Sequence, residues 1–181
     1  MKGGITPDFY LPTEIFFRQG ILSEAGPILK NLGSRALIVT TSSDLHKFGD
    51  IIDIVTNSIS SSGLGFLIYD EIDDVPNTEY VDSATYFAKK SRCDIVLGLG
   101  SVNSINTARA VSVLANNFLF CEDLFDDPAV SPPLPLVTIP AYPLSGFELL
   151  PMFYLRDLTE PRKKVYSHRY LFPRATIVDP M

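Results

Sequence analysis

The 181-residue sequence has only two histidines and two cysteines, which limits the chemistry that it supports. A catalytic metal site needs about three convergent protein ligands, and His46 and His168 are too far apart in the sequence to predict one. Cys93 and Cys121 show no metal-ligating spacing, and we expect both to be buried structural thiols. No Ser/His/Asp or Cys/His pattern identifies a nucleophile with its base. The sequence therefore predicts no catalytic residue and no metal ligand.

Basic residues and long apolar runs are also scarce. The 15 lysines and arginines are outnumbered by 21 acidic residues, and the net charge of −6 argues against a nucleic-acid partner. The one dense basic cluster, at 162–169, is typical of a solvated face. The longest apolar runs are strand-sized, so no membrane span is predicted. With no apolar leader at its start, the sequence predicts a cytoplasmic protein.

Short apolar runs alternate with amphipathic segments along most of the chain. The predicted strands lie at 10–19, 36–40, 65–69, 94–98 and 134–139. The predicted helices lie at 21–31, 48–60, 78–90 and 104–114. This alternation predicts an α/β fold with a doubly wound parallel sheet, whose ligands bind at the carboxyl ends of the strands.

The pattern changes after about residue 150. Segments 152–155 and 164–167 flank a charged turn and predict an antiparallel hairpin, and 175–178 predicts a closing strand. We therefore expect one domain over 1–181, with a βα core over about 10–150 and the hairpin and closing strand over 151–181.

One segment, 96–110, reads as an apolar strand, a tight glycine turn and a helix start. Unpaired amides and the helix dipole favour an anion at such a start, and glycines let a phosphate approach the backbone. Asn103 stands where the three-glycine dinucleotide fingerprint has its last glycine, and Val102 adds a branched side chain. The alternative is a plain strand-to-helix turn.

The chain over about 10–181 resembles the N-terminal half of the iron-containing (group III) alcohol dehydrogenase family. That family shares its fold with dehydroquinate synthase and glycerol dehydrogenase. The resemblance is collinear and is carried by segments 17–20, 36–40, 75–78, 135–140, 145–148 and 175–180.

This resemblance implies a Rossmann-like oxidoreductase domain, the NAD- or NADP-binding half of an enzyme that transfers a hydride to or from alcohols and aldehydes. By that resemblance the cofactor-binding residues are Thr41, Ser42, Gly98, Gly100, Ser101, Asn103, Thr138 and Ser145. For Thr41 and Ser42 the alternative is capping of the next helix.

Several residues depart from the family pattern at its functional positions. The phosphate loop, GGGSxxDxAK in the family, here keeps only the first glycine, Gly100, and the alanine, Ala108. Asn106 stands in place of the acid and Arg109 in place of the lysine. In the second loop, PTTAGTGSE in the family, four residues are expected to narrow or fill the cofactor groove: Tyr142, Pro143, Leu144 and Phe147.

In the family, iron or zinc is held by an Asp and three His of an all-helical C-terminal domain, which this sequence does not contain. The metal would then come only with that missing domain, and we expect no activity from this chain alone. A homodimer or a separate chain carrying the metal domain is the expected partner. The alternative is a degenerate, non-catalytic homologue acting as a binding or interaction module.

Overall fold

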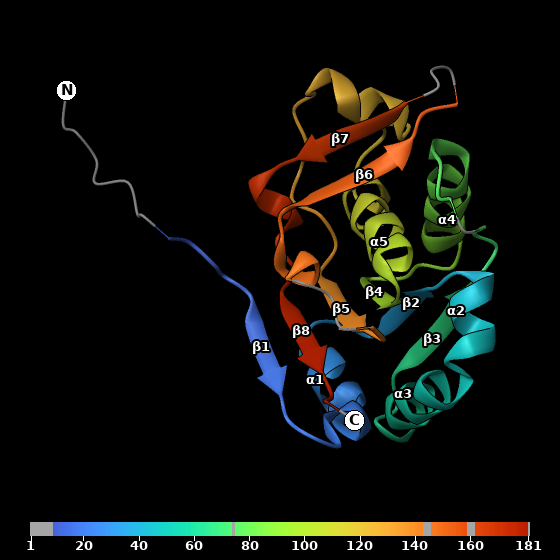
Figure 1. Ribbon diagram of the computed structural model, residues 1–181, viewed down its shortest axis with the longest axis vertical. Coiled ribbons are helices and arrows are strands. Elements are labelled where there is room, and N and C mark those ends of the chain that lie inside the picture. The colour runs from blue at the N-terminus through green and yellow to red at the C-terminus, as the bar shows by residue number, and fades with distance from the viewer. Residues whose placement is uncertain (1–8, 74, 143–145, 159–161, 181) are drawn as a thin grey trace.

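The computed structural model describes residues 9–73, 75–142, 146–158 and 162–180, which form a parallel sheet and a separate hairpin. Six strands run in the order β1-β8-β5-β4-β2-β3, and β6 pairs with β7 antiparallel (Figure 1). The Rossmann-like sheet and the hairpin predicted from the sequence are both confirmed. None of the helices in these ranges combines the length and the hydrophobicity of a membrane span.

The bounds of the elements are close to the predicted ranges. The sheet contains β1 (Glu14–Phe17), β2 (Arg35–Val39), β3 (Gly65–Tyr69), β4 (Ile95–Gly100), β5 (Leu136–Pro140) and β8 (Ala175–Val178), and the hairpin contains β6 (Met152–Arg156) and β7 (Lys163–Ser167). The helices are α1 (Ala25–Lys30), α2 (Ser42–Lys47), α3 (Gly49–Ser61), α4 (Thr78–Lys90) and α5 (Val102–Ala115). Short 3-10 turns are η1 (Ile21–Glu24), η2 (Glu122–Asp126), η3 (Phe147–Leu149) and η4 (Arg169–Leu171).

Helices cover the sheet on both faces, which explains why its central strands are apolar throughout. Successive side chains of a strand point to opposite faces. Leu97 of β4 packs into the cluster that contains α1 and α3, whereas its neighbour Val96 packs into the cluster that contains α4, α5 and the hairpin. Every residue of β4 is buried. The central strands therefore have no solvent-facing side on which polar residues could alternate.

Helix α5 is enclosed rather than amphipathic. Its residues from Ser104 to Leu114 are all buried, because the sheet lies under it, α4 lies beside it and the β6–β7 hairpin crosses over it (Figure 1). The amide of Tyr154 on β6 donates to Asn106 Oδ1 at 3.1 Å. A helix covered in this way must find protein partners for each of its polar side chains.

Two elements differ from the sequence prediction. The helix expected at 21–31 starts as the 3-10 turn η1 before α1. Before α3, a separate helix α2 was not predicted. Thr41 caps α2, since its side chain accepts from the amide of Asp44, and Phe48 leaves helical geometry between α2 and α3. The predicted helix start at Phe48 is thus the start of the second of two helices.

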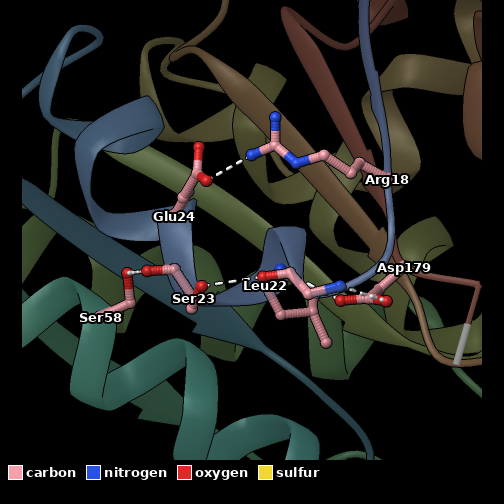
Figure 2. Close-up of polar contacts among 7 residues, drawn as sticks. Arg18, Leu22, Ser23, Glu24, Ser58 and Asp179 are labelled. Carbon is pink, nitrogen blue, oxygen red and sulfur yellow. Dashed lines mark hydrogen bonds and ion pairs between the residues drawn. The ribbon is translucent and has the colours of Figure 1, made fainter.

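Polar contacts tie the segment that follows β1 to the segment that follows β8. The Asp179 carboxylate, directly after β8, accepts from the amides of Gly20 at 3.0 Å and Leu22 at 3.4 Å (Figure 2). The Ser58 hydroxyl of α3 donates to the carbonyl of Ser23 at 2.6 Å (Figure 2). Gly20 has φ +79°, a left-handed conformation that glycine adopts without strain. Edge strand β1 is therefore anchored through η1 to both β8 and α3.

We predict that Gly26→Ala destabilises the fold by about 1–3 kcal/mol, because α1 crosses α3 at this glycine. A Cβ at Gly26 would lie 2.1 Å from the Ser58 carbonyl oxygen, so the two helices would have to separate. Gly49→Ala is the matched control, since a Cβ there meets nothing within 4 Å. Urea unfolding measures both variants. Equal free energies of unfolding for Gly26→Ala and the wild type would contradict this reading.

Candidate functional site

Several of the sequence-predicted residues, among them Thr41, Gly100 and Ser101, lie at the crevice between β2 and β4. From β2 the chain continues to β3 on one side of the sheet and returns to β4 on the other, so the direction of winding reverses here. Ligands of open α/β sheets bind outside the carboxyl ends of the strands at such a switch point. Thr41 follows β2 and Ser101 follows β4, and the amide of Thr41 donates to Ser104 Oγ at 3.0 Å.

Two glycines shape the corner between β4 and α5. A Cβ at Gly98 would lie 2.8 Å from Ala108 Cβ, so this glycine lets α5 lie close on the strand. Gly100 has φ +128°, outside the range that other residues adopt readily. The first-turn amides of Val102 and Ser104 have no hydrogen-bond partner among the described residues. The corner therefore keeps the backbone donors expected of an anion site.

A carboxylate from the same chain lies at this corner. Asp44 Oδ2 accepts from the Ser101 amide at 2.8 Å, from Ser101 Oγ at 2.6 Å and from Ser104 Oγ at 2.6 Å. A Cβ at Gly100 would lie 2.4 Å from the same oxygen. Asp44 is 3% exposed. The position in which the sequence analysis placed a cofactor phosphate is thus held by an acidic side chain.

The residues after β2 serve the start of α2. Thr41 is buried, and its Oγ1 accepts from the Asp44 amide at 3.0 Å, so the capping alternative is confirmed for this residue. Ser42 is exposed and donates to the carbonyl of Asp70 at 2.6 Å. In a capping box the third helical residue turns back to the cap amide. Here the Thr41 amide donates to Ser104 Oγ, and the Asp44 carboxylate faces α5 instead of turning back to Thr41.

The first residues after β5, Ala141 and Tyr142, lie at the same end of the sheet. The amide of Ala141 donates to the Gly100 carbonyl at 2.9 Å, which extends the pairing beyond β4. The Tyr142 hydroxyl accepts from Lys47 Nζ at 3.0 Å, and its ring meets the Phe48 ring edge-on at 4.7 Å. Tyr142 therefore joins this loop to the α2–α3 junction across the end of β4.

The remaining predicted residues lie on α5 and β5. Asn103 lies in the first turn of α5, where its carbonyl accepts from Thr107 Oγ1 at 3.0 Å. Thr138 is buried on β5, with its hydroxyl 2.8 Å from that of Thr176 on β8. Ser145 lies outside the described residues, as do Pro143 and Leu144, which were expected to narrow the groove. Thr138 therefore faces a hydroxyl partner of the next strand.

Arg109 positions the segment that follows this loop. Its side chain is fully buried and donates to the carbonyls of Phe147 at 2.6 Å and Met152 at 3.1 Å. Burial lowers the pKa of the guanidinium, and the nearby Glu148 carboxylate opposes that shift. The planar guanidinium thus joins η3 to the first residue of the hairpin.

Two cavities are lined in part by residues of the neighbouring segments, α2 and the start of the loop after β5. One, of about 530 Å³, is lined by residues that include Ser42, Asn77, Tyr80 and Arg156. The other, of about 480 Å³, is lined by residues that include Pro140, Ala141, Glu148, Thr176 and Asp179. Neither cavity is lined by Asp44, Ser101 or Ser104, the residues whose hydrogen bonds form the corner.

The sparse metal-ligating residues do not converge. In the ranges that the structure describes, no group of three His, Cys, Asp or Glu side chains could hold a metal ion. His46 is exposed, and His168 accepts from the Tyr170 amide through Nδ1. Cys93 and Cys121 are buried, as predicted, and burial raises the pKa of both thiols.

Asp44, whose carboxylate accepts three hydrogen bonds at the corner, was not among the residues predicted from the sequence. Its local signal was present, since Thr41 followed by an acid three residues later is typical of a capped helix start. Its partners Ser101 and Ser104 are 57 and 60 residues away in the sequence, and no local pattern predicts that contact.

Comparison with known proteins gives a consistent family. A sequence model of "Iron-containing alcohol dehydrogenase" matches residues 12–180. The NAD-dependent methanol dehydrogenase of Bacillus methanolicus is 25% identical over 174 residues, which cover 96% of this chain and 45% of that protein. The chain spans less than half the length of the curated relatives it matches.

Solved structures agree with that match. An iron-containing alcohol dehydrogenase of Thermotoga maritima is 33% identical, with a TM-score of 0.86 over 97% of this chain and 48% of that one. The NADH-dependent butanol dehydrogenase A of Thermotoga maritima is 25% identical, with a TM-score of 0.89 over 97% of this chain and 44% of that one.

We predict that Arg109→Lys, which restores the residue type of the family pattern, destabilises this chain by about 2 kcal/mol. A lysine lacks the planar fork, and hydrogen bonds from a charged donor contribute about 1.5–3 kcal/mol each. Arg169→Lys, at an exposed position, is the control and should change stability by less than about 0.5 kcal/mol. Chemical denaturation measures both, and equal losses in the two variants would refute the role given to the fork.

Proposed function

Since the chain belongs to the iron-containing alcohol dehydrogenase family, we propose that it is the NAD- or NADP-binding half of an alcohol or aldehyde hydride-transfer enzyme. The names of its relatives support this proposal, because they include an NAD-dependent methanol dehydrogenase and an NADH-dependent butanol dehydrogenase. These relatives are more than twice the length of the matched region. We therefore propose the activity of a complete enzyme for this chain together with the metal-binding domain, and not for residues 1–181 alone.

One observation carries the proposal: a glycine corner and a helix start lie at the point where the winding of the sheet reverses. Gly98 brings α5 onto β4, and the amides of Val102 and Ser104 have no partner within the described ranges. A helix start with available amides favours a phosphate. Thr41, on the neighbouring strand end, lies across the crevice from Ser104.

The side chains at the corner fit a dinucleotide less well than the backbone does. A pyrophosphate at the start of α5 would meet the Asp44 carboxylate, which already accepts from the Ser101 amide. Tyr142 joins the loop after β5 to Lys47 across the same edge. With the corner arranged in this way, we propose weak binding of NAD or NADP and derive no catalytic step from it.

The proposed reaction also needs metal ligands that the described residues do not bring together. No group of three candidate ligands occurs among them, whereas a catalytic metal site uses about three protein ligands and an open position. Iron or zinc would therefore be held by a further domain, on this chain or on a separate one. We propose that residues 1–181 alone do not transfer hydride.

A second candidate is a non-catalytic homologue that acts as a binding or interaction module. The contacts that cross the corner favour it, because Asp44 and Tyr142 both occupy the edge where a cofactor would enter. In this case the chain keeps the family fold and uses another surface.

We predict that NAD and NADP bind the purified chain with dissociation constants in the millimolar range, about −4 kcal/mol. Isothermal titration measures the affinity, and light scattering in the same buffer measures the mass of the species. Binding at this strength supports the nucleotide-binding half. The absence of both heat and a thermal shift, in a folded sample, would favour the non-catalytic module.

A further inference from the structure

We propose that Asp44 is the resident anion of the α5 helix start and the residue that decides which anions bind there. This inference rests on the proposed nucleotide-binding function, because it concerns the same corner. The family fold alone would not predict the weak binding of NAD or NADP proposed above. We attribute that weak binding to this one side chain.

The contacts of Asp44 match those that a phosphate oxygen would make. A single oxygen, Oδ2, accepts one backbone amide and two hydroxyl groups, all at 2.6–2.8 Å. Hydrogen bonds to a carboxylate are stronger than those between neutral groups. The hydroxyl of Ser101, which sits at the N-cap of α5, makes no cap contact with its own helix and donates to Asp44 instead. The carboxylate thus takes the donors nearest to the glycine turn.

The same carboxylate anchors α2. Among the residues of this helix, Asp44 is the one with a fully buried side chain, while Ser42, Ser43 and Lys47 are exposed and Leu45 is partly buried. Polar contacts, and not a large apolar face, hold α2 against α5. An incoming anion therefore competes with one side chain and does not have to open a packed core.

The backbone amides that Asp44 does not bind explain why an incoming phosphate would compete with its carboxylate. The amides of Val102 and Ser104 have no partner among the described residues, so a phosphate could still reach them. A phosphate oxygen at those amides would lie beside the Asp44 carboxylate, and like charges at close range repel each other. The corner then disfavours a polyanion even where its backbone is suited to one.

The test compares Asp44→Asn, which removes the charge and keeps the size, with Asp44→Ser, which also opens space. Asp50→Asn is the control, because it makes the same change of charge at an exposed position in the first turn of α3. The probes are inorganic pyrophosphate and NADH, each titrated calorimetrically at fixed ionic strength. We expect both Asp44 variants to bind pyrophosphate at least tenfold more tightly than the wild type and Asp50→Asn.

Stability provides a second readout, since removal of the carboxylate leaves Ser101 and Ser104 donors without their acceptor. We expect a lower unfolding temperature for Asp44→Ser that pyrophosphate raises again, with a smaller shift for the wild type and for Asp50→Asn. If the serine variant does not fold, the asparagine variant carries the same comparison.

The outcomes separate this inference from the proposed function. If pyrophosphate binds the Asp44 variants more tightly and NADH binds neither the wild type nor the variants, the role of Asp44 is supported and nucleotide binding is not. If NADH binds the wild type and the Asp44 variants equally and pyrophosphate gains no affinity, nucleotide binding is supported and the role of Asp44 is overturned. Folded Asp44 variants that gain affinity for neither probe also overturn it.

Discussion

The burial of α5 on all sides is the constraint on which the rest of this structure depends. From Ser104 to Leu114 the helix has no exposed side chain, although it carries Ser104, Asn106 and Arg109. Buried polar groups must be hydrogen-bonded, or they cost the full penalty of desolvation. Each of these residues therefore fixes a neighbouring element: Ser104 meets α2, Asn106 meets β6, and Arg109 meets both η3 and β6.

This constraint links stability to function at the glycine corner. The hydroxyl of Ser104 and the amide of Ser101 need an acceptor, and in this chain Asp44 provides it. A cofactor phosphate in the same place would satisfy the same donors only while it was bound. The Asp44 carboxylate satisfies these hydrogen-bond donors without a ligand, and it lowers the affinity of the corner for a phosphate.

The backbone fold identifies the family, whereas the side chains of the corner determine which ligand can bind there. The parallel sheet and the glycine turn match the iron-containing alcohol dehydrogenases over residues 12–180. Asp44 and Tyr142 lie at the edge where a ligand would approach, and buried Arg109 holds η3 and the start of the hairpin in place behind it. The family match therefore accounts for the course of the backbone. What the corner can bind depends on the side-chain contacts of Asp44, Tyr142 and Arg109.

Local physics decided most of the secondary structure. The apolar run of β3, the helix α4 and the closing strand β8 have the bounds that the sequence predicted, since each is marked by its own periodicity and its own caps or turns. Helix α2 was missed because six residues show too little periodicity to reveal a helix. Its cap, Thr41, was nonetheless among the predicted alternatives.

The sequence by itself determined the α/β class, the family and the position of the glycine corner, because each of these depends on residues that are adjacent or regularly spaced. Only the tertiary structure decided what lies in that corner. Asp44 meets Ser101 and Ser104 across about 60 residues of sequence, and it does so because β2 and β4 are neighbours in the sheet. A contact made by the pairing of distant strands has no signature in the local sequence, since neither segment needs the other to form its own strand or helix.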